Sequence, residues 1–135
     1  MTDEDALELA ERLYSALQDA DGTASFLDLC APDAVVEYPA ERRLPYGGTW
    51  QGREAIGEFL EVHDEAEDIL AFEPSEMVAS DGVVFVIGFF EGRARQTDRT
   101  WTTAFVHVLS MGDGHLVRWR AFFDTAAAVE AHATD

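Results

Sequence analysis

A histidine and an aspartate near the end of the chain are the residues whose types and positions predict chemistry most directly. Strand alternation in the segment WTTAFVHVLS puts His107 on one face with Trp101, Thr103, Phe105 and Leu109. The opposite face is also largely apolar, so the imidazole is not freely solvated in either case. Burial lowers the pKa of such a histidine and favours the neutral ring, which can both donate and accept a hydrogen bond. His107 is therefore predicted to be a polar group either of a pocket or of a satisfied core.

Asp124 follows the last predicted strand, in which Trp119 and Phe123 alternate with Arg118 and Arg120. This alternation predicts that the aromatic residues face inward and the arginines outward. At the mouth of an apolar pocket, a carboxylate has a raised pKa and is a better base than a solvated one toward a proton next to a carbonyl. Two other interpretations stay open. Asp124 can cap the helix that follows, and alternation groups it with the arginines unless a bulge turns it inward.

Helices are predicted mainly in the first half of the chain. Thr2 caps a helix whose acidic first residues suit the positive end of its dipole, and Asp21-Gly22 ends it. Apolar spacing predicts three further elements, which are a short helix over 26–30, a strand over 34–38 and a helix over 53–63. The stretch PAERRLPYGGTWQG before the third helix is rich in turn residues and is predicted to be a loop.

From residue 69 the chain becomes rich in β-branched and aromatic residues, and turn-forming triplets divide it. Four strands are predicted there, over residues 69–79, 83–95, 100–111 and 115–123, and a short helix follows from Thr125. The short connections make these strands an antiparallel meander. Helices followed by an antiparallel sheet predict an α+β fold, in which the helices pack on one face of a curved sheet.

Composition restricts the classes of partner. The 135 residues, 47% of them hydrophobic, suffice for one domain with its own core, and they contain no apolar run of the roughly 20 residues that a membrane span needs. The chain has 27 acidic residues and nine basic ones, all of them Arg, for a net charge of -18. Nucleic-acid binding rests on clustered positive charge, so neither a nucleic-acid nor a membrane partner is expected. The acidic amino terminus is unlike a signal peptide and Cys30 is the only cysteine, so we expect a cytoplasmic protein without an intramolecular disulfide.

The order of these elements, with LPYGGTWQGREAIGEFL opening the third helix and GHLVRWRAFFDT closing the sheet, resembles the nuclear transport factor 2-like superfamily. The SnoaL-like and ketosteroid-isomerase-like branch is the most similar. The resemblance covers nearly the whole chain and implies a single SnoaL-like domain over residues 1–135. It implies an α+β cone, a cone-shaped barrel in which a strongly curved mixed, mainly antiparallel sheet packs against three N-terminal helices. The open end of the cone is then an apolar pocket, and the domain is expected to form a homodimer.

The resemblance also implies roles for individual residues. SnoaL-like cyclases resemble this chain in having a His on the penultimate strand and an Asp that closes the last one, which makes Asp124 the general base and His107 its polar partner. Tyr14 matches the tyrosine with which ketosteroid isomerases donate a hydrogen bond to the oxyanion. Substrate contacts are expected from aromatic residues of the pocket and its lip, which are Tyr38, Tyr46, Trp50, Phe90, Trp119 and Phe123. For Tyr46 and Trp50, a loop that only covers the core is an equal alternative.

Two reactions of the superfamily are not expected. Tyr38 and His107 stand at the positions of two carboxylic acids on which steroid isomerisation depends, and VVFVIGFF lacks the Arg and Asp that the epoxide hydrolases use. We therefore expect proton transfer on a small apolar carbonyl compound, as in a cyclase, an isomerase or a dehydratase, with no cofactor and no metal. The alternative is a non-catalytic domain that binds a hydrophobic ligand or serves as a dimerising accessory domain.

The other titratable residues are interpreted as structural. A solvated acidic face is predicted from Glu61, Glu65, Glu67 and Asp68. The remaining histidines lie at a helix end, beside a turn and near the terminus, without the spacing of metal ligands; they are His63, His115 and His132.

The charge predicts a halophilic response of the folded state. Because the net charge of -18 repels itself, raising KCl from about 0.1 M to about 1 M, which shortens the screening length from about 10 Å to about 3 Å, should raise the melting temperature strongly. The melting temperature is followed by circular dichroism, with an uncharged osmolyte as the control. A melting temperature that does not change with salt would show that the acidic residues do not limit stability.

Overall fold

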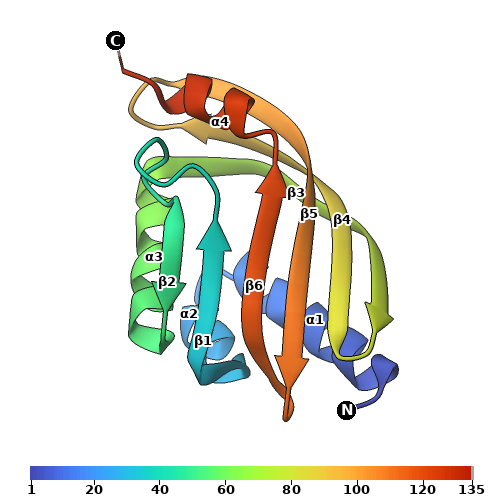
Figure 1. The fold of residues 1–135 in the computed structure, drawn as a ribbon. Coiled ribbons are helices and arrows are strands. Elements are labelled where there is room, and N and C mark those ends of the chain that lie inside the picture. The colour runs from blue at the N-terminus through green and yellow to red at the C-terminus, as the bar shows by residue number, and fades with distance from the viewer. Residues whose placement is uncertain (135) are drawn as a thin grey trace.

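Six strands form one curled sheet, and helices cover one side of it, in the computed structural model, which describes residues 1–134 (Figure 1). The helices are α1 (Asp3–Gln18), α2 (Thr23–Leu29), α3 (Arg53–Ala66) and α4 (Thr125–His132). The strands are β1 (Cys30–Tyr38), β2 (Gly48–Gln51), β3 (Glu67–Ser80), β4 (Val83–Ala94), β5 (Arg99–Gly112) and β6 (His115–Phe123). Their order in the sheet is β2-β1-β6-β5-β4-β3. Only β1 and β6 pair in parallel; the other pairs are antiparallel.

Helix α1 forms where the sequence predicts it, because its first turn is capped from both directions. The Thr2 side chain accepts a hydrogen bond from the Asp5 backbone N–H, and the Asp5 carboxylate accepts one from the Thr2 backbone N–H. The apolar stripe of the helix then packs inward, with Leu9, Leu13 and Tyr14 all buried. The cap thus fixes the start of the helix, and the stripe turns Tyr14 toward the sheet.

Strand β5 supplies the inner wall of the sheet, and its alternation is as predicted. Trp101, Phe105 and His107 are buried beneath the helices. In the last strand, β6, Trp119 is also buried, whereas Arg118 extends outward and pairs with a carboxylate of β1. The aromatic side chains of these two central strands therefore face the same interior space.

The α+β fold class and its mixed, mainly antiparallel sheet are confirmed, with three corrections of detail. The sheet is curled but open, with β2 and β3 at its edges. The three helices that the resemblance implied are not all N-terminal, because α3 follows the first two strands. The fourth helix, α4, begins at Thr125 as the sequence predicts and lies near the end of the sheet where β6 finishes (Figure 1). Strand β2 lies in a stretch that the sequence predicts to be a loop. Its four residues form a strand only by pairing with β1, and the local sequence does not encode that pairing.

Strand β4 leaves a row of apolar residues on the outer side of the sheet. Phe85, Ile87 and Phe89 are 43%, 43% and 38% exposed, and Phe122 on β6 is 50% exposed. Among the helices of residues 1–134, none combines the length and apolar character that crossing a membrane requires. The exposed residues of β4 and β6 therefore form an apolar surface on the outer face that the described residues leave uncovered.

Candidate functional site

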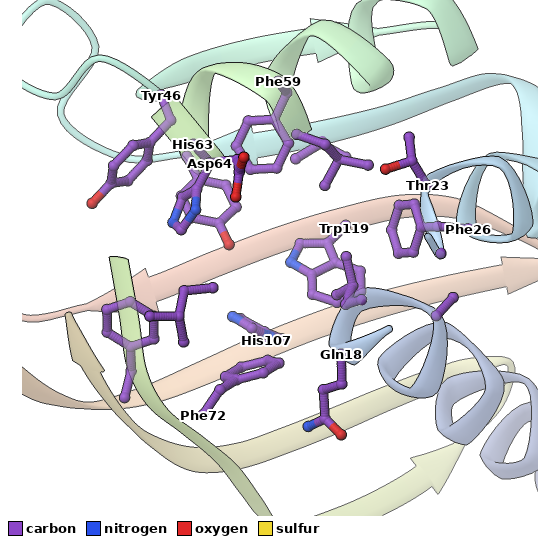
Figure 2. A pocket seen from close by; sticks show the side chains of 18 of the residues that line it. Gln18, Thr23, Phe26, Tyr46, Phe59, His63, Asp64, Phe72, His107 and Trp119 are labelled. Atoms are coloured by element: carbon purple, nitrogen blue, oxygen red, sulfur yellow. The ribbon is translucent and has the colours of Figure 1, made fainter. Parts of the chain in front are cut away.

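A cavity of about 440 Å³ lies between the sheet and the helices, within the size range of small-molecule sites. Its walls come from the end of α1, from α2 and α3, and from strands β1, β3, β4, β5 and β6. Most of the lining is apolar and aromatic. Figure 2 shows Tyr46 and His63 on one side of the cavity, with His107 and Phe72 on the other. The polar groups therefore lie at separate places in an otherwise apolar space.

His107 is paired with Tyr14 inside the protein. The Tyr14 hydroxyl lies 2.7 Å from His107 Nδ1, and both residues are buried. The imidazole also packs between Phe105 and Trp119, at ring-centroid distances of 4.3 and 4.8 Å. Burial lowers the pKa of His107 to about 3 and raises that of Tyr14. The pair is thus neutral, and when Tyr14 donates to Nδ1 the hydrogen of the ring sits on Nε2.

The structure places His107 in the cavity lining, and its pairing with Tyr14 also gives it the partner that a core histidine needs. Tyr14 is not among the lining residues and contacts the cavity through His107. The Tyr14 hydroxyl therefore holds the orientation of the imidazole and does not itself face the cavity, where the resemblance implied a direct contact with an oxyanion.

Trp119 brings an unpaired hydrogen-bond donor to the cavity wall. The residue is 3% exposed, and its Nε1 has no hydrogen-bond partner among residues 1–134. The nitrogen atom itself is buried, and the Tyr38 hydroxyl lies close to it. Tyr38 also lines the cavity, and burial raises the pKa of its hydroxyl while the nearby indole N–H of Trp119 opposes that change. A buried N–H without a partner costs roughly 1–3 kcal/mol, so this one indicates a place for a ligand acceptor.

The prediction that Asp124 faces the cavity as its base is wrong. The Asp124 carboxylate is the N-cap of α4, where Oδ1 accepts a hydrogen bond of 3.1 Å from the Ala127 backbone N–H. The residue is exposed and is absent from the cavity lining. No bulge near Asp124 turns it inward, because β6 stays in register with β5 from Arg118 to Phe123. The interpretation as a helix cap, which the sequence left open, is the one that the geometry supports.

Glu67 corrects a second prediction, that of a solvated acidic face. Its side chain is fully buried at the junction of α3 and β3, and the residue is 1% exposed. The Tyr46 hydroxyl donates to Oε1 at 2.9 Å, and the Trp101 indole N–H donates to Oε2. His132 Nε2 lies 3.3 Å from Oε2, and His63 Nε2 lies 3.5 Å from Oε1. We call these five residues the Glu67 cluster.

The Glu67 cluster keeps the carboxylate charged. Burial alone would raise the pKa of Glu67, but the hydrogen bond with His132, the nearby His63 and the two donors together lower it. Burial lowers the pKa of His63 and the Glu67 carboxylate opposes that shift. Three members of the cluster, Tyr46, His63 and Trp101, line the cavity, whereas Glu67 lies behind them.

The predicted substrate contacts divide into two groups. The cavity lining includes Tyr38, Tyr46, Phe90, Trp119 and Phe123. Trp50 is not part of it; its indole N–H donates to the Tyr46 carbonyl at 3.2 Å, so it supports the loop that carries Tyr46. That loop also depends on Gly47, where an added Cβ would lie 2.6 Å from the Ala40 carbonyl oxygen.

Sequence reasoning missed the Glu67 cluster, although one local signal was present. His63 and Glu67 are four residues apart, a spacing that brings side chains together at the end of a helix. The other donors come from positions 46, 101 and 132, which only the folded sheet and α4 bring together. Among residues 1–134, no group of three or more His, Cys, Asp or Glu side chains is arranged to hold a metal ion.

A curled sheet with helices over an apolar cavity defines the class of nuclear transport factor 2-like proteins, as the sequence resemblance implied. Residues 10–119 match the model of the SnoaL-like domain, and the chain belongs to that family. A comparison with curated proteins finds no match.

Solved structures agree with this classification. An NTF2-like protein from Burkholderia xenovorans LB400 is 27% identical, with a TM-score of 0.90 over 98% of this chain and 99% of the other. TerC, co-crystallised with polyporic acid, is also 27% identical, with a TM-score of 0.82 over 96% of this chain and 99% of TerC. A putative isomerase from Bacillus subtilis, at 22% identity and a TM-score of 0.77 over 97% and 95% of the two chains, shares the fold.

Neutral His107 predicts how stability depends on pH. His107 has a pKa of about 6.5 in the unfolded state and about 3 in the folded state. In acid the unfolded state therefore binds more protons, and the free energy of unfolding decreases as the pH is lowered below 6.5. Between about pH 7 and pH 5 this one residue should remove about 2 kcal/mol. Urea denaturation at both pH values, at constant salt, measures the loss.

The His107→Phe variant should lose about 2 kcal/mol less than the wild type over the same interval, whatever its absolute stability. His115→Gln, in a histidine near the surface turn between β5 and β6, is the matched control and should keep the wild-type slope. Equal slopes for His107→Phe and wild type would mean that His107 takes up its proton as readily in the folded protein as in the unfolded one.

Proposed function

We propose that the protein binds a small, largely apolar compound with a carbonyl oxygen in the cavity, and transfers a proton on it without a cofactor. The single observation that carries the proposal is the buried Trp119 N–H, which lies near the Tyr38 hydroxyl but makes no hydrogen bond of full geometry with the described residues. A carbonyl oxygen satisfies that donor, and the aromatic lining accommodates the remainder of the ligand.

His107 gives the proposal its chemistry. The imidazole and the Trp119 indole are in ring contact at 4.8 Å, so two N–H donors can approach one ligand oxygen. A neutral imidazole is suited to polarise a carbonyl, because it donates a hydrogen bond without surrendering its proton. Such preorganised donors stabilise the negative charge that develops on oxygen when a neighbouring carbon loses a proton. Cyclisation, isomerisation and dehydration all begin with that step.

The relative co-crystallised with a small organic acid supports the same use of the fold. TerC was co-crystallised with polyporic acid, and its chain aligns with this one over almost its whole length. The alternative, a cavity that binds a hydrophobic ligand without turnover, is favoured by the position of Asp124, which leaves the predicted base outside the site. Ligand binding is common to both functions, and it is therefore tested first.

We propose in addition that a second copy of this chain covers the outer face of the sheet. The exposed apolar residues of that face lie on the two strands that flank β5, with Phe85 and Ile87 on β4 and Phe122 on β6. Side chains of this size and exposure on one flat surface are typical of subunit interfaces. The net charge of -18 on each copy opposes association, so the homodimer should be favoured by salt.

Ligand binding is predicted to depend on the Trp119 N–H. The probes are 2-tetralone and tetralin, which differ in one carbonyl group, and binding is measured by quenching of tryptophan fluorescence and by NMR shifts. Wild-type protein should bind the ketone about 2- to 10-fold more tightly than the hydrocarbon, because one additional hydrogen bond contributes about that factor to affinity.

In Trp119→Phe this preference should disappear, while the affinity for tetralin changes only through packing. The ratio of the two affinities is taken within each protein, so the effect of the smaller phenyl ring on packing enters both affinities and cancels from the ratio. A preference that persists in the variant would remove Trp119 from ligand recognition, and a cavity that binds neither probe would overturn the proposed function.

The outer-face homodimer predicts a mass of twice 14.9 kDa by light scattering in about 1 M KCl, where charge repulsion is screened. Phe85→Glu should convert it to the monomer, because a charge is buried at the centre of the interface. Ala126→Glu adds the same charge on α4 and should leave the dimer intact. A monomer in every condition, or a dimer unaffected by Phe85→Glu, contradicts the proposed interface.

A further inference from the structure

The Glu67 cluster places a carboxylate charge directly behind the cavity wall. Glu67 does not line the cavity, and its oxygens are occupied by Tyr46, Trp101 and His132. It therefore cannot reach a ligand itself. Its charge acts on whatever lies between it and the cavity, and in a water-poor interior that effect is stronger than at a surface.

His63 is the titratable group between Glu67 and the cavity. It extends from the last turns of α3, packs on the Tyr46 ring at a centroid distance of 4.4 Å, and lines the cavity. Its Nε2 lies 3.5 Å from Glu67 Oε1, and the two side chains form an ion pair when the ring takes up a proton. No hydrogen bond from the described residues occupies Nδ1 of this ring, which leaves that nitrogen for a ligand.

The two histidines of the cavity thus have different surroundings. His107 faces a neutral hydroxyl and aromatic rings, and no carboxylate of residues 1–134 lies against it to balance a positive charge. His63 faces Glu67 and Asp64, while His132 is the one basic group near it. A proton on His63 is stabilised by the buried carboxylate, whereas a proton on His107 is not. Of the two, His63 is the ring suited to accept one.

We infer that His63 is the general base of the cavity and that Glu67 is its positioning residue. The inference rests on the proposed function and deepens it, because it assigns the base that Asp124 does not supply. The substrate class is an apolar ketone with an acidic C–H next to its carbonyl.

The proton balance of the step is complete within the cavity. The free imidazole of His63 takes the proton from carbon, the C–H electron pair forms the C=C bond of the enolate, and the carbonyl π electrons move to oxygen. Trp119 and His107 donate to that oxygen, and Glu67 balances the new imidazolium. In a conjugated enolate, return of the proton from His63 to a different carbon completes an isomerisation. If the imidazolium first exchanges its proton with water, return to the same carbon replaces the original hydrogen with one from the solvent.

Hydrogen exchange of 2-tetralone in D2O tests the inference without knowledge of the natural substrate. Proton NMR follows loss of the hydrogens next to the carbonyl, and wild-type protein should accelerate it over buffer. His63→Gln should lose about 100-fold or more of that rate, the usual contribution of a general base. His115→Gln, far from the cavity, is the matched control and should keep the wild-type rate.

The pH profile separates a positioning role for Glu67 from a merely structural one. The exchange rate should rise with pH as His63 loses its proton, and this limb should coincide with the His63 pKa measured by NMR of the imidazole. Glu67→Gln removes the charge, so the pKa of His63 and the limb should both shift to lower pH. If Glu67→Gln does not fold, agreement between the limb and the His63 titration in the wild type decides the question.

Each result supports or overturns the assignment. Exchange at the wild-type rate in His63→Gln, or a limb that does not follow the His63 titration, overturns it. If 2-tetralone binds but exchanges no faster than in buffer, the inference fails while the binding function stands. If 2-tetralone does not bind at all, the proposed function itself fails.

Discussion

The interior of this protein is organised around one carboxylate that has no contact with water. Burying an unpaired carboxylate costs several kcal/mol, and the cost is offset only when its oxygens accept good hydrogen bonds. Glu67 meets this requirement with donors from four places in the chain: the loop before β2, the end of α3, strand β5 and helix α4. Each oxygen has two of these partners, and removing any one of the four weakens the compensation of the buried charge. The carboxylate therefore holds together the elements that form one end of the cavity.

The same arrangement divides the cavity into two electrostatic regions. Around His107 the groups are neutral, with a tyrosine hydroxyl and aromatic rings as neighbours, and they favour hydrogen-bond donation over proton exchange. Around His63 a buried negative charge favours proton uptake. An acid–base reaction on a carbonyl compound needs both properties, one at the oxygen and one at the carbon. The fold supplies the hydrogen-bond donor His107 from the sheet and the proton acceptor His63 from α3. These walls lie opposite each other, so the two histidines stay apart (Figure 2).

Most of the fold could be predicted from the sequence because its signals are local. The cap at Thr2, the alternation through His107 and the turns between strands each depend on a few neighbouring residues. The candidate site was predicted only in part, since His107 and five of six aromatic contacts line the cavity while Asp124 does not. Glu67 was assigned to the surface because acidic neighbours surround it in sequence. Its partners lie 21, 34 and 65 residues away, and a contact of that kind has no local signature.

The carboxyl-terminal helix α4 belongs to the site because it carries a partner of Glu67. By local sequence α4 is a weak element of eight residues, and its amphipathic character is slight. Asp124 caps its start and Arg99 binds carbonyl oxygens at its end, so both termini are fastened to the sheet region. Between these points His132 reaches the buried carboxylate. Asp124, expected to act as the base, therefore contributes by fixing the helix that completes the environment of Glu67. Asp124 thus has no direct part in the proposed proton transfer. By holding α4 in place, it keeps His132 at Glu67, whose charge acts on His63.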